Sequence, residues 1–208
     1  MKMNSFIVLC GGKSKRMGQD KGSMSLNGRP MILYILKTIS HFADEIVLIL
    51  RDDKQSDEYK KLFKNQILIN NINIKIFTDT VKDQGPLGGI FSGLQHVVSN
   101  QAMVLPCDSP FVSEFFIKRM LELSKSTAYE SFVPKWSDGR LEPLHSIYKK
   151  DTQDIIQKLL EEDILDVKSY INKLNVKFID VESLDPTGRS FFNINQNKDI
   201  PNDLDVKK

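Results

Sequence analysis

Three short runs of almost purely apolar residues constrain the fold of this chain more than any other feature of its sequence. They are Ser5 to Cys10, Glu45 to Leu50 and Ala102 to Pro106. A strand with one face in water alternates apolar and polar residues, whereas a run without alternation is typical of a strand covered on both faces. The three runs therefore predict the centre of a mainly parallel sheet with helices on each side.

Other β-rich runs and amphipathic segments alternate with these three, as in a sheet flanked by helices. The remaining predicted strands are residues 74–78, 131–134, 144–148 and 176–180, and the predicted helices are residues 31–41, 56–63, 88–98, 113–123, 152–160 and 167–174. Pro30 is expected in the first turn of the helix that follows it. We predict an α/β fold with three layers, a doubly wound, Rossmann-like arrangement around a mostly parallel but mixed sheet.

Length and composition exclude several classes of protein. We expect the 208 residues to form a single domain, 1–208, and a net charge of +2 gives no indication of nucleic-acid binding. The two cysteines, Cys10 and Cys107, form no disulfide framework, which fits a reducing compartment. No signal peptide and no apolar stretch long enough for a bilayer is found, so we expect a cytoplasmic protein without membrane contact.

A basic, glycine-rich segment follows the first predicted strand. It contains the pair Gly11 and Gly12 and the cations Lys13, Lys15, Arg16 and Lys21. Paired glycines let backbone N–H groups approach phosphate oxygens, and clustered cations can neutralise a nucleoside triphosphate. The spacing matches neither a Walker A loop nor a dinucleotide-binding turn. A solvated basic loop is the alternative, but the carboxyl ends of sheet strands are where open α/β folds bind ligands.

One aspartate, Asp108, stands at the end of the third apolar run, between Pro106 and Pro110. A carboxylate at the tip of a stiffened strand suits Mg²⁺, which takes one or two carboxylates together with substrate phosphates and waters. The alternative is a plain turn residue in Asp-Ser-Pro. The neighbouring Cys107 is expected to be a buried, inert thiol.

Two further segments carry polar groups that could face a ligand. Asp79 follows the predicted strand 74–78 and precedes Gly85-Pro86-Leu87-Gly88-Gly89, a tight turn that opens a helix. Backbone N–H groups of such a turn can bind a ligand; the alternative is a plain turn between strand and helix. On an extended stretch Asn193 and Asn195 lie on one face, because side chains alternate with a period of two. Two carboxamides could bind a polar ring such as a pterin, or Asn195 could cap the last helix.

These segments together resemble a known enzyme family. The first is similar to the signature loop of nucleotidyltransferases that activate sugars, isoprenoid precursors and molybdopterin: it reads Leu9-Cys10-Gly11-Gly12-Lys13-Ser14-x-Arg16-Met17-Gly18-x-Asp20-Lys21, then Leu26-x-Gly28-x-Pro30. The Gly-Gly pair resembles the molybdenum cofactor guanylyltransferase (MobA) branch; cytidylyltransferases usually have Ala-Ala-Gly there. Cys10 replaces the usual alanine, and because both are small we expect no functional change. A further segment, Gly139 to Tyr148, resembles the family's Pro-Leu-x-x-x-Tyr strand, which is preceded by a basic residue, here Arg140. Five segments thus follow in the family's order over nearly the whole chain.

The resemblance implies a nucleotidyltransferase fold and transfer of GMP from GTP to the phosphate of molybdopterin cofactor, with pyrophosphate as leaving group and Mg²⁺ as cofactor. It implies GTP contacts at Leu9, Cys10, Gly11, Gly12, Lys21, Asp79 and Asp108, catalytic roles for Lys21, Arg16 and Asp108, with Asp108 as metal ligand, and second-substrate contacts at Arg140, Asn193 and Asn195. It also implies transient contact with molybdoenzyme apoproteins and other cofactor-synthesis proteins.

The alternatives are a related cytidylyltransferase, a sugar-phosphate nucleotidyltransferase, or a non-catalytic protein that delivers cofactor. The presence of both Lys21 and Asp108 argues against the last of these. The GTP interpretation requires the glycine turn and Asp108 to converge on one magnesium–triphosphate complex.

Overall fold

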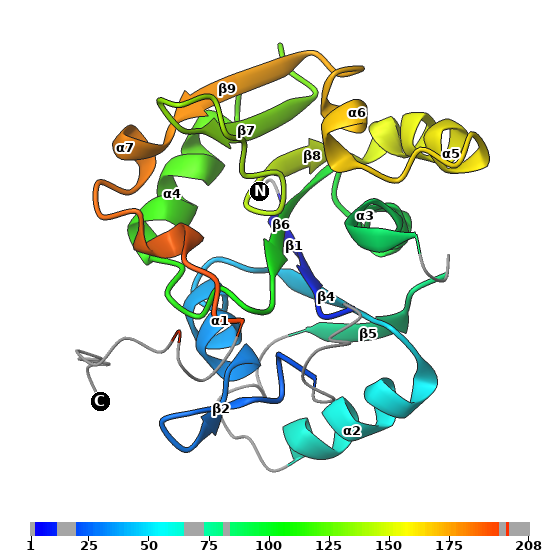
Figure 1. Ribbon diagram of the computed structural model, residues 1–208, viewed down its shortest axis with the longest axis vertical. Helices are drawn as coiled ribbons and strands as arrows, with labels where there is room; N and C mark the ends of the chain where they lie inside the picture. The colour runs from blue at the N-terminus through cyan, green and yellow to red at the C-terminus, as the bar shows by residue number, and fades with distance from the viewer. Residues whose placement is uncertain (1–2, 12–19, 65–72, 81–83, 196–198, 200–208) are drawn as a thin grey trace.

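The structure is a computed structural model that describes residues 3–11, 20–64, 73–80, 84–195 and 199 (Figure 1). Within these residues every helix is too short or too polar to span a bilayer. Seven of the described strands form one sheet in the order β5-β4-β1-β6-β8-β7-β9. Their bounds are β1 Ser5–Leu9, β4 Glu45–Leu50, β5 Ile74–Thr78, β6 Gln101–Pro106, β7 Ser131–Lys135, β8 Ile147–Lys149 and β9 Val176–Asp180. Of these strands β8 pairs antiparallel to its neighbours and the others pair parallel, so the prediction of a mixed, mostly parallel sheet is confirmed.

Helices cover both faces of the sheet, as the unbroken apolar strands predict. Phe6 and Val8 of β1 pack into the core of one face and Ile7 and Leu9 into the core of the other. The first face carries α1 Ile32–Ile39, α2 Asp53–Lys64, α4 Glu114–Leu123 and α7 Val181–Leu184; the second carries α3 Gly85–His96, α5 Gln153–Glu161 and α6 Val167–Ile171. The predicted three-layer, doubly wound arrangement is therefore confirmed.

Two local predictions were wrong. Pro30 lies not in a helix but in a short hairpin, in which β2 Ser25–Leu26 pairs with β3 Arg29–Pro30, and α1 begins only at Ile32. The turn of this hairpin is Asn27-Gly28, whose φ angles of 51° and 77° suit a two-residue turn.

The strand predicted at 144–148 starts later, at Ile147. Residues before it form a turn in which the His145 N–H donates to the Glu142 carbonyl at 3.0 Å, and Pro143 has no N–H to give to a sheet. The turn changes where Leu144 and His145 point, because a strand would have alternated them across the sheet. Both instead line the cavity described below.

A buried carboxylate ties strands together at the end of the sheet opposite that cavity. Glu45 accepts hydrogen bonds from Ser5 Oγ, from Lys75 Nζ at 2.9 Å and from the Val98 N–H. Burial alone would raise the pKa of Glu45, but these hydrogen bonds and the Lys75 charge outweigh it and hold that pKa below its ordinary value.

We therefore expect Glu45→Gln to destabilise the protein at pH 7 by about 2 kcal/mol, because buried donors lose a charged acceptor. A carboxylate with a lowered folded-state pKa stabilises the fold above its ordinary pKa of 4.5, and this contribution is lost as pH falls through the lower folded value. Urea unfolding at several pH values measures the difference between wild type and variant. The difference in unfolding free energy should be full at pH 7 and should shrink below about pH 4.5. A difference that does not depend on pH would contradict the lowered pKa of Glu45.

Candidate functional site

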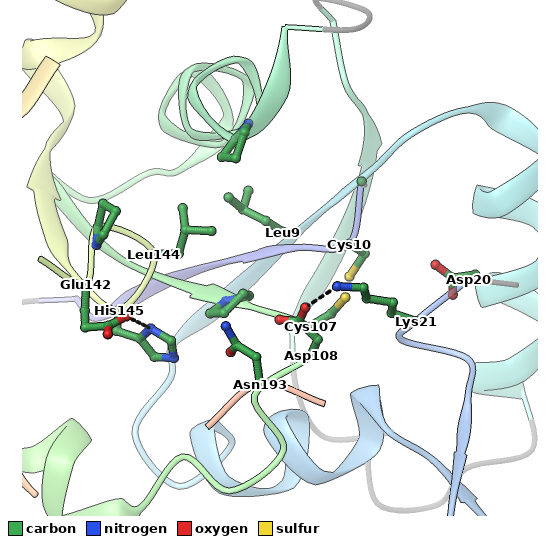
Figure 2. Close-up of a pocket in the computed structure, with 14 residues that line it drawn as sticks. Leu9, Cys10, Asp20, Lys21, Cys107, Asp108, Glu142, Leu144, His145 and Asn193 are labelled. Atoms are coloured by element: carbon green, nitrogen blue, oxygen red, sulfur yellow. Dashed lines mark hydrogen bonds and ion pairs between the residues drawn. The ribbon is translucent and has the colours of Figure 1, made fainter. Parts of the chain in front are cut away.

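A cavity of about 340 Å³ opens at the carboxyl ends of β1 and β6 (Figure 2), a size within the range of ligand pockets. The parallel register pairs Leu9 with Pro106, so the residues that follow on each strand emerge side by side. Both halves of the chain contribute to the lining, which comprises Leu9, Cys10, Gly11, Asp20, Lys21, Pro86, Pro106, Cys107, Asp108, Glu142, Pro143, Leu144, His145 and Asn193. Gly11, the first glycine of the predicted phosphate-binding segment, and Asp108 thus line the same cavity.

An ion pair lies at the centre of this lining. Lys21 Nζ is 2.7 Å from Asp108 Oδ2, and the two side chains are 31% and 14% exposed (Figure 2). Lys21 Nζ also donates to Asn195 Oδ1 at 2.6 Å. Three segments that are far apart in the chain thus meet at the ammonium group of Lys21. Because Lys21 and Asp108 both line the cavity and are partly exposed, a ligand there can reach a cation and a carboxylate.

Asp20, the residue before Lys21, is held by hydrogen bonds from α2. Asp20 accepts hydrogen bonds from Tyr59 Oη at 2.6 Å, from the Ser23 N–H at 2.9 Å and from Gln55 Nε2. Gln55 Nε2 also donates to the carbonyl of Cys10 at 3.0 Å, so the same amide holds the end of β1. These bonds restrict the backbone on which Lys21 is carried.

Gly22 leaves room for this anchor. A Cβ at that position would lie 2.1 Å from Tyr59 Oη, far inside contact distance. We expect Gly22→Ala to displace the Tyr59 hydroxyl from Asp20 and to cost about 1–3 kcal/mol of stability, the usual effect of overpacking. Thermal unfolding together with nucleotide affinity measures both consequences.

The matched control is the same substitution in a Tyr59→Phe background, where the atom that clashes is absent. The stability cost of Gly22→Ala should be clearly smaller there, because the nearest ring atom, Cζ, lies at 3.3 Å. An equal cost in both backgrounds would show that the hydroxyl is not what the added methyl group meets.

Gly11 is open for a different reason. A Cβ added there would come no closer than 3.5 Å to the described part of the chain, where the Arg51 nitrogen is the nearest atom at an ordinary contact distance. Packing against the described residues therefore does not require glycine at this position, which lines the cavity. A ligand that approaches the backbone closely would require it.

The two cysteines are in the cavity lining and are largely shielded from solvent. Cys10 and Cys107 are free thiols and both are buried. The neighbouring Cys10 thiol and burial raise the pKa of Cys107, so its thiol stays protonated at neutral pH.

Several predicted site residues lie elsewhere. Asp79 follows β5 and accepts a hydrogen bond from Ser92 Oγ at 2.7 Å, and it does not line the cavity. Arg140 is also outside the lining: its Nε donates to Asp138 at 2.7 Å, and its guanidinium packs over the Trp136 ring. Arg16 and Gly12 lie outside the described residues. The predicted roles of all four residues stay predictions.

The sequence did not identify Glu142 and His145 as residues of the cavity lining, or Ser109 as the hydrogen-bond partner of His145. In the sequence, His145 shows no metal-ligand spacing with His41 or His96, so nothing in that spacing distinguishes it from the other two histidines. It is 1% exposed, yet it lines the cavity, and its Nε2 lies 3.0 Å from Ser109 Oγ. The signal available in the sequence was the Glu-Pro-Leu-His order, in which Pro143 favours a turn that brings Glu142 and His145 together.

The donor groups fit a magnesium ion that arrives with a nucleotide. Among the described residues no cluster of three or more His, Cys, Asp or Glu side chains could hold a metal by itself. Asp108 offers a carboxylate at the cavity, and its Oδ1 accepts no hydrogen bond from the described part of the chain. One carboxylate completed by phosphates and waters is the usual way in which proteins hold Mg²⁺.

The chain matches the family model described as MobA-like NTP transferase domain over residues 6–176. It is 34% identical to a probable molybdenum cofactor guanylyltransferase of Methanothermobacter thermautotrophicus, covering 96% of this chain and 98% of that protein. A protein of the same description from Methanosarcina mazei is 30% identical, over 95% of this chain and 88% of that one.

A solved structure supports the same relationship. The molybdopterin-guanine dinucleotide biosynthesis protein A of Archaeoglobus fulgidus superimposes with a TM-score of 0.79 at 26% identity, over 94% of each chain. Fold and sequence agree, and the chain belongs to the family of MobA-like NTP transferase domains.

Proposed function

We propose that this protein transfers GMP from GTP to the terminal phosphate of molybdopterin cofactor and releases pyrophosphate. The observation that carries the proposal is one cavity lined by both halves of the chain, with the Lys21–Asp108 pair at its centre. Such a cavity offers a triphosphate side near the end of β1 and a second-substrate side near Asn193. The relatives named above share the chain almost end to end, which supports the choice of substrates.

The chemistry requires little of the protein beyond positioning and charge. The attacking group is a phosphate monoester, whose second pKa of about 6 makes it largely dianionic at neutral pH. It therefore needs no general base to attack the α-phosphorus. Pyrophosphate leaves as the new phosphoanhydride bond forms, and catalysis consists of alignment and neutralisation of the charge on the oxygens.

Three residues of the cavity lining have roles in nucleotide binding in this proposal. Lys21 would neutralise the triphosphate, and the open backbone at Gly11 would let it approach the end of β1. Asp108 would hold Mg²⁺, which supplies further neutralisation of phosphate charge when it is bound. Binding of the nucleotide would compete with the Lys21–Asp108 ion pair, because both partners of that pair then have new ligands.

Pyrophosphate release with molybdopterin and each of GTP, ATP, CTP and UTP tests the proposal. We expect release with GTP, dependent on molybdopterin and on Mg²⁺. A preference for CTP would make the chain a cytidylyltransferase, and activity with a sugar phosphate in place of molybdopterin would change the second substrate. No release with any pair, combined with tight binding of molybdopterin guanine dinucleotide, would indicate a delivery protein. Contact with molybdoenzyme apoproteins remains part of the proposal for product delivery.

A further inference from the structure

A buried chain of hydrogen bonds leads from the interior to the second-substrate side of the cavity. Ser109 Oγ donates to Asn193 Oδ1 and lies 3.0 Å from His145 Nε2. Ser109 is fully buried, His145 is 1% exposed, and Asn193 reaches the cavity, where Figure 2 places it between His145 and Asp108. None of the roles derived above uses Ser109 or His145.

The direction of these bonds follows from counting hydrogens. A serine hydroxyl has one hydrogen, and here it goes to the oxygen of the Asn193 carboxamide. Ser109 Oγ must then accept from His145, so Nε2 of that ring carries a hydrogen. The Nδ2 amino group of Asn193 donates to no residue in the described part of the chain, and it is left for a ligand.

The histidine is held in place by its surroundings. Its ring meets Phe116 and Phe191 edge to face, at centroid distances of 6.3 and 5.1 Å. Its Nδ1 lies 3.7 Å from Glu142 Oε2, beyond hydrogen-bond distance, and Glu142 is itself fixed by Trp136 Nε1 at 2.6 Å. Within the described residues the ring therefore makes one hydrogen bond, the one to Ser109.

Asn195 shows the same arrangement independently. Its Oδ1 accepts from Lys21 Nζ, and because an ammonium group can only donate, the oxygen of this carboxamide must face the protein. Both asparagines thus direct their oxygens toward the protein. The Nδ2 amino groups of the two carboxamides, which are N–H donors, are then the groups that can bind a ligand.

We propose that Ser109 and His145 are positioning residues that orient the Asn193 carboxamide with its amino group toward the cavity, so that Asn193 binds a hydrogen-bond acceptor of the second substrate. Because Asn193 lies next to Asp108 in the cavity (Figure 2), where the reaction is proposed to occur, that acceptor is an oxygen of the reacting phosphate. The proposal rests on the proposed function for the identity of that substrate. It places Asn193 on the reacting phosphate and not on the amino groups of the pterin ring.

Kinetics of His145 variants test the positioning role. His145→Phe keeps an aromatic ring between Phe116 and Phe191 but cannot donate, whereas His145→Gln keeps an N–H donor. We expect His145→Phe to raise KM for molybdopterin about fivefold, the effect of one hydrogen bond, with KM for GTP nearly unchanged. His145→Gln should recover most of this loss.

A double-mutant cycle separates positioning from general damage. In an Asn193→Ala background His145→Phe should raise KM for molybdopterin by less than about twofold, because the group it orients is gone. A purely structural role would instead raise both KM values and give the same effect in both backgrounds, which would overturn the proposal.

An NMR measurement needs no turnover. With ¹⁵N-labelled protein and inorganic phosphate as the probe, the Asn193 Nδ2–H₂ signals should shift in wild type and in His145→Gln but not in His145→Phe. Equal behaviour of wild type and His145→Phe, or no shift in wild type, would overturn the proposal. If these signals behave as expected while wild-type protein releases no pyrophosphate from GTP and molybdopterin, the proposed function falls and the orientation of Asn193 stands.

Discussion

Asp108→Ala is expected to lower the turnover of pyrophosphate release by at least about two orders of magnitude, the usual loss when a preorganised charge stabiliser is removed. The carboxylate is 14% exposed at the end of β6 and faces the cavity, so its charge acts in surroundings less polar than bulk water. Steady-state kinetics at several magnesium concentrations should also show a weaker response to Mg²⁺, because the proposed protein ligand is gone.

The fold should tolerate this substitution. Lys21, the partner left behind, is 31% exposed and can reach water. The matched control is Asp57→Ala: Asp57 on α2 also pairs with a lysine, Lys60 at 3.5 Å, but its side chain is 69% exposed and does not line the cavity. Asp57→Ala should retain full activity. Wild-type turnover in Asp108→Ala, with an unchanged melting temperature, would remove Asp108 from its proposed role.

Lys21→Met is expected to lower kcat/KM for GTP by about a hundredfold, since methionine preserves much of the length of the side chain but removes the charge. The loss should appear in nucleotide affinity as well as in turnover, because the triphosphate is charged before and during the reaction. Lys60→Met is the matched control and should leave both parameters unchanged. Nucleotide binding by calorimetry, together with initial rates, measures the two contributions.

The two substitutions should not be additive. Lys21 and Asp108 contact each other at 2.7 Å, and each variant disturbs the partner of the other. The double variant should therefore lose less than the product of the two single losses. Strict additivity would indicate that Lys21 and Asp108 act independently of each other on the bound nucleotide.

Much of the fold was predictable because its signals are local. The runs in β1, β4 and β6 contain almost no polar residue, and such runs occur where both faces of a strand are covered. Ser113 was expected at the start of a helix, and it caps α4 by accepting from the Phe116 N–H at 3.1 Å. The prediction that Pro30 lies in the first turn of α1 was wrong, because the hairpin at residues 25–30 holds Pro30 by a backbone pairing that apolar periodicity does not report.

The candidate site was predictable in part for the same reason. Gly11 and Asp108 each follow a buried strand, and parallel strands end at the same edge of a sheet. Arg140 was chosen for its charge and its place in a motif. It packs on Trp136 and pairs with Asp138 outside the cavity lining, and its contact with the second substrate stays a prediction. His145 was set aside because a single histidine has no spacing to interpret.

By itself the sequence determined the sheet, its two covered faces and the strand ends at which chemistry is possible, because hydrophobic periodicity and glycine or proline turns act over a few neighbouring residues. Only the tertiary structure decided which of those ends meet. Lys21 reaches Asp108 across 87 positions and Asn195 across 174, and His145 reaches Ser109 across 36. Such contacts are set by strand order and helix packing, which no local pattern specifies.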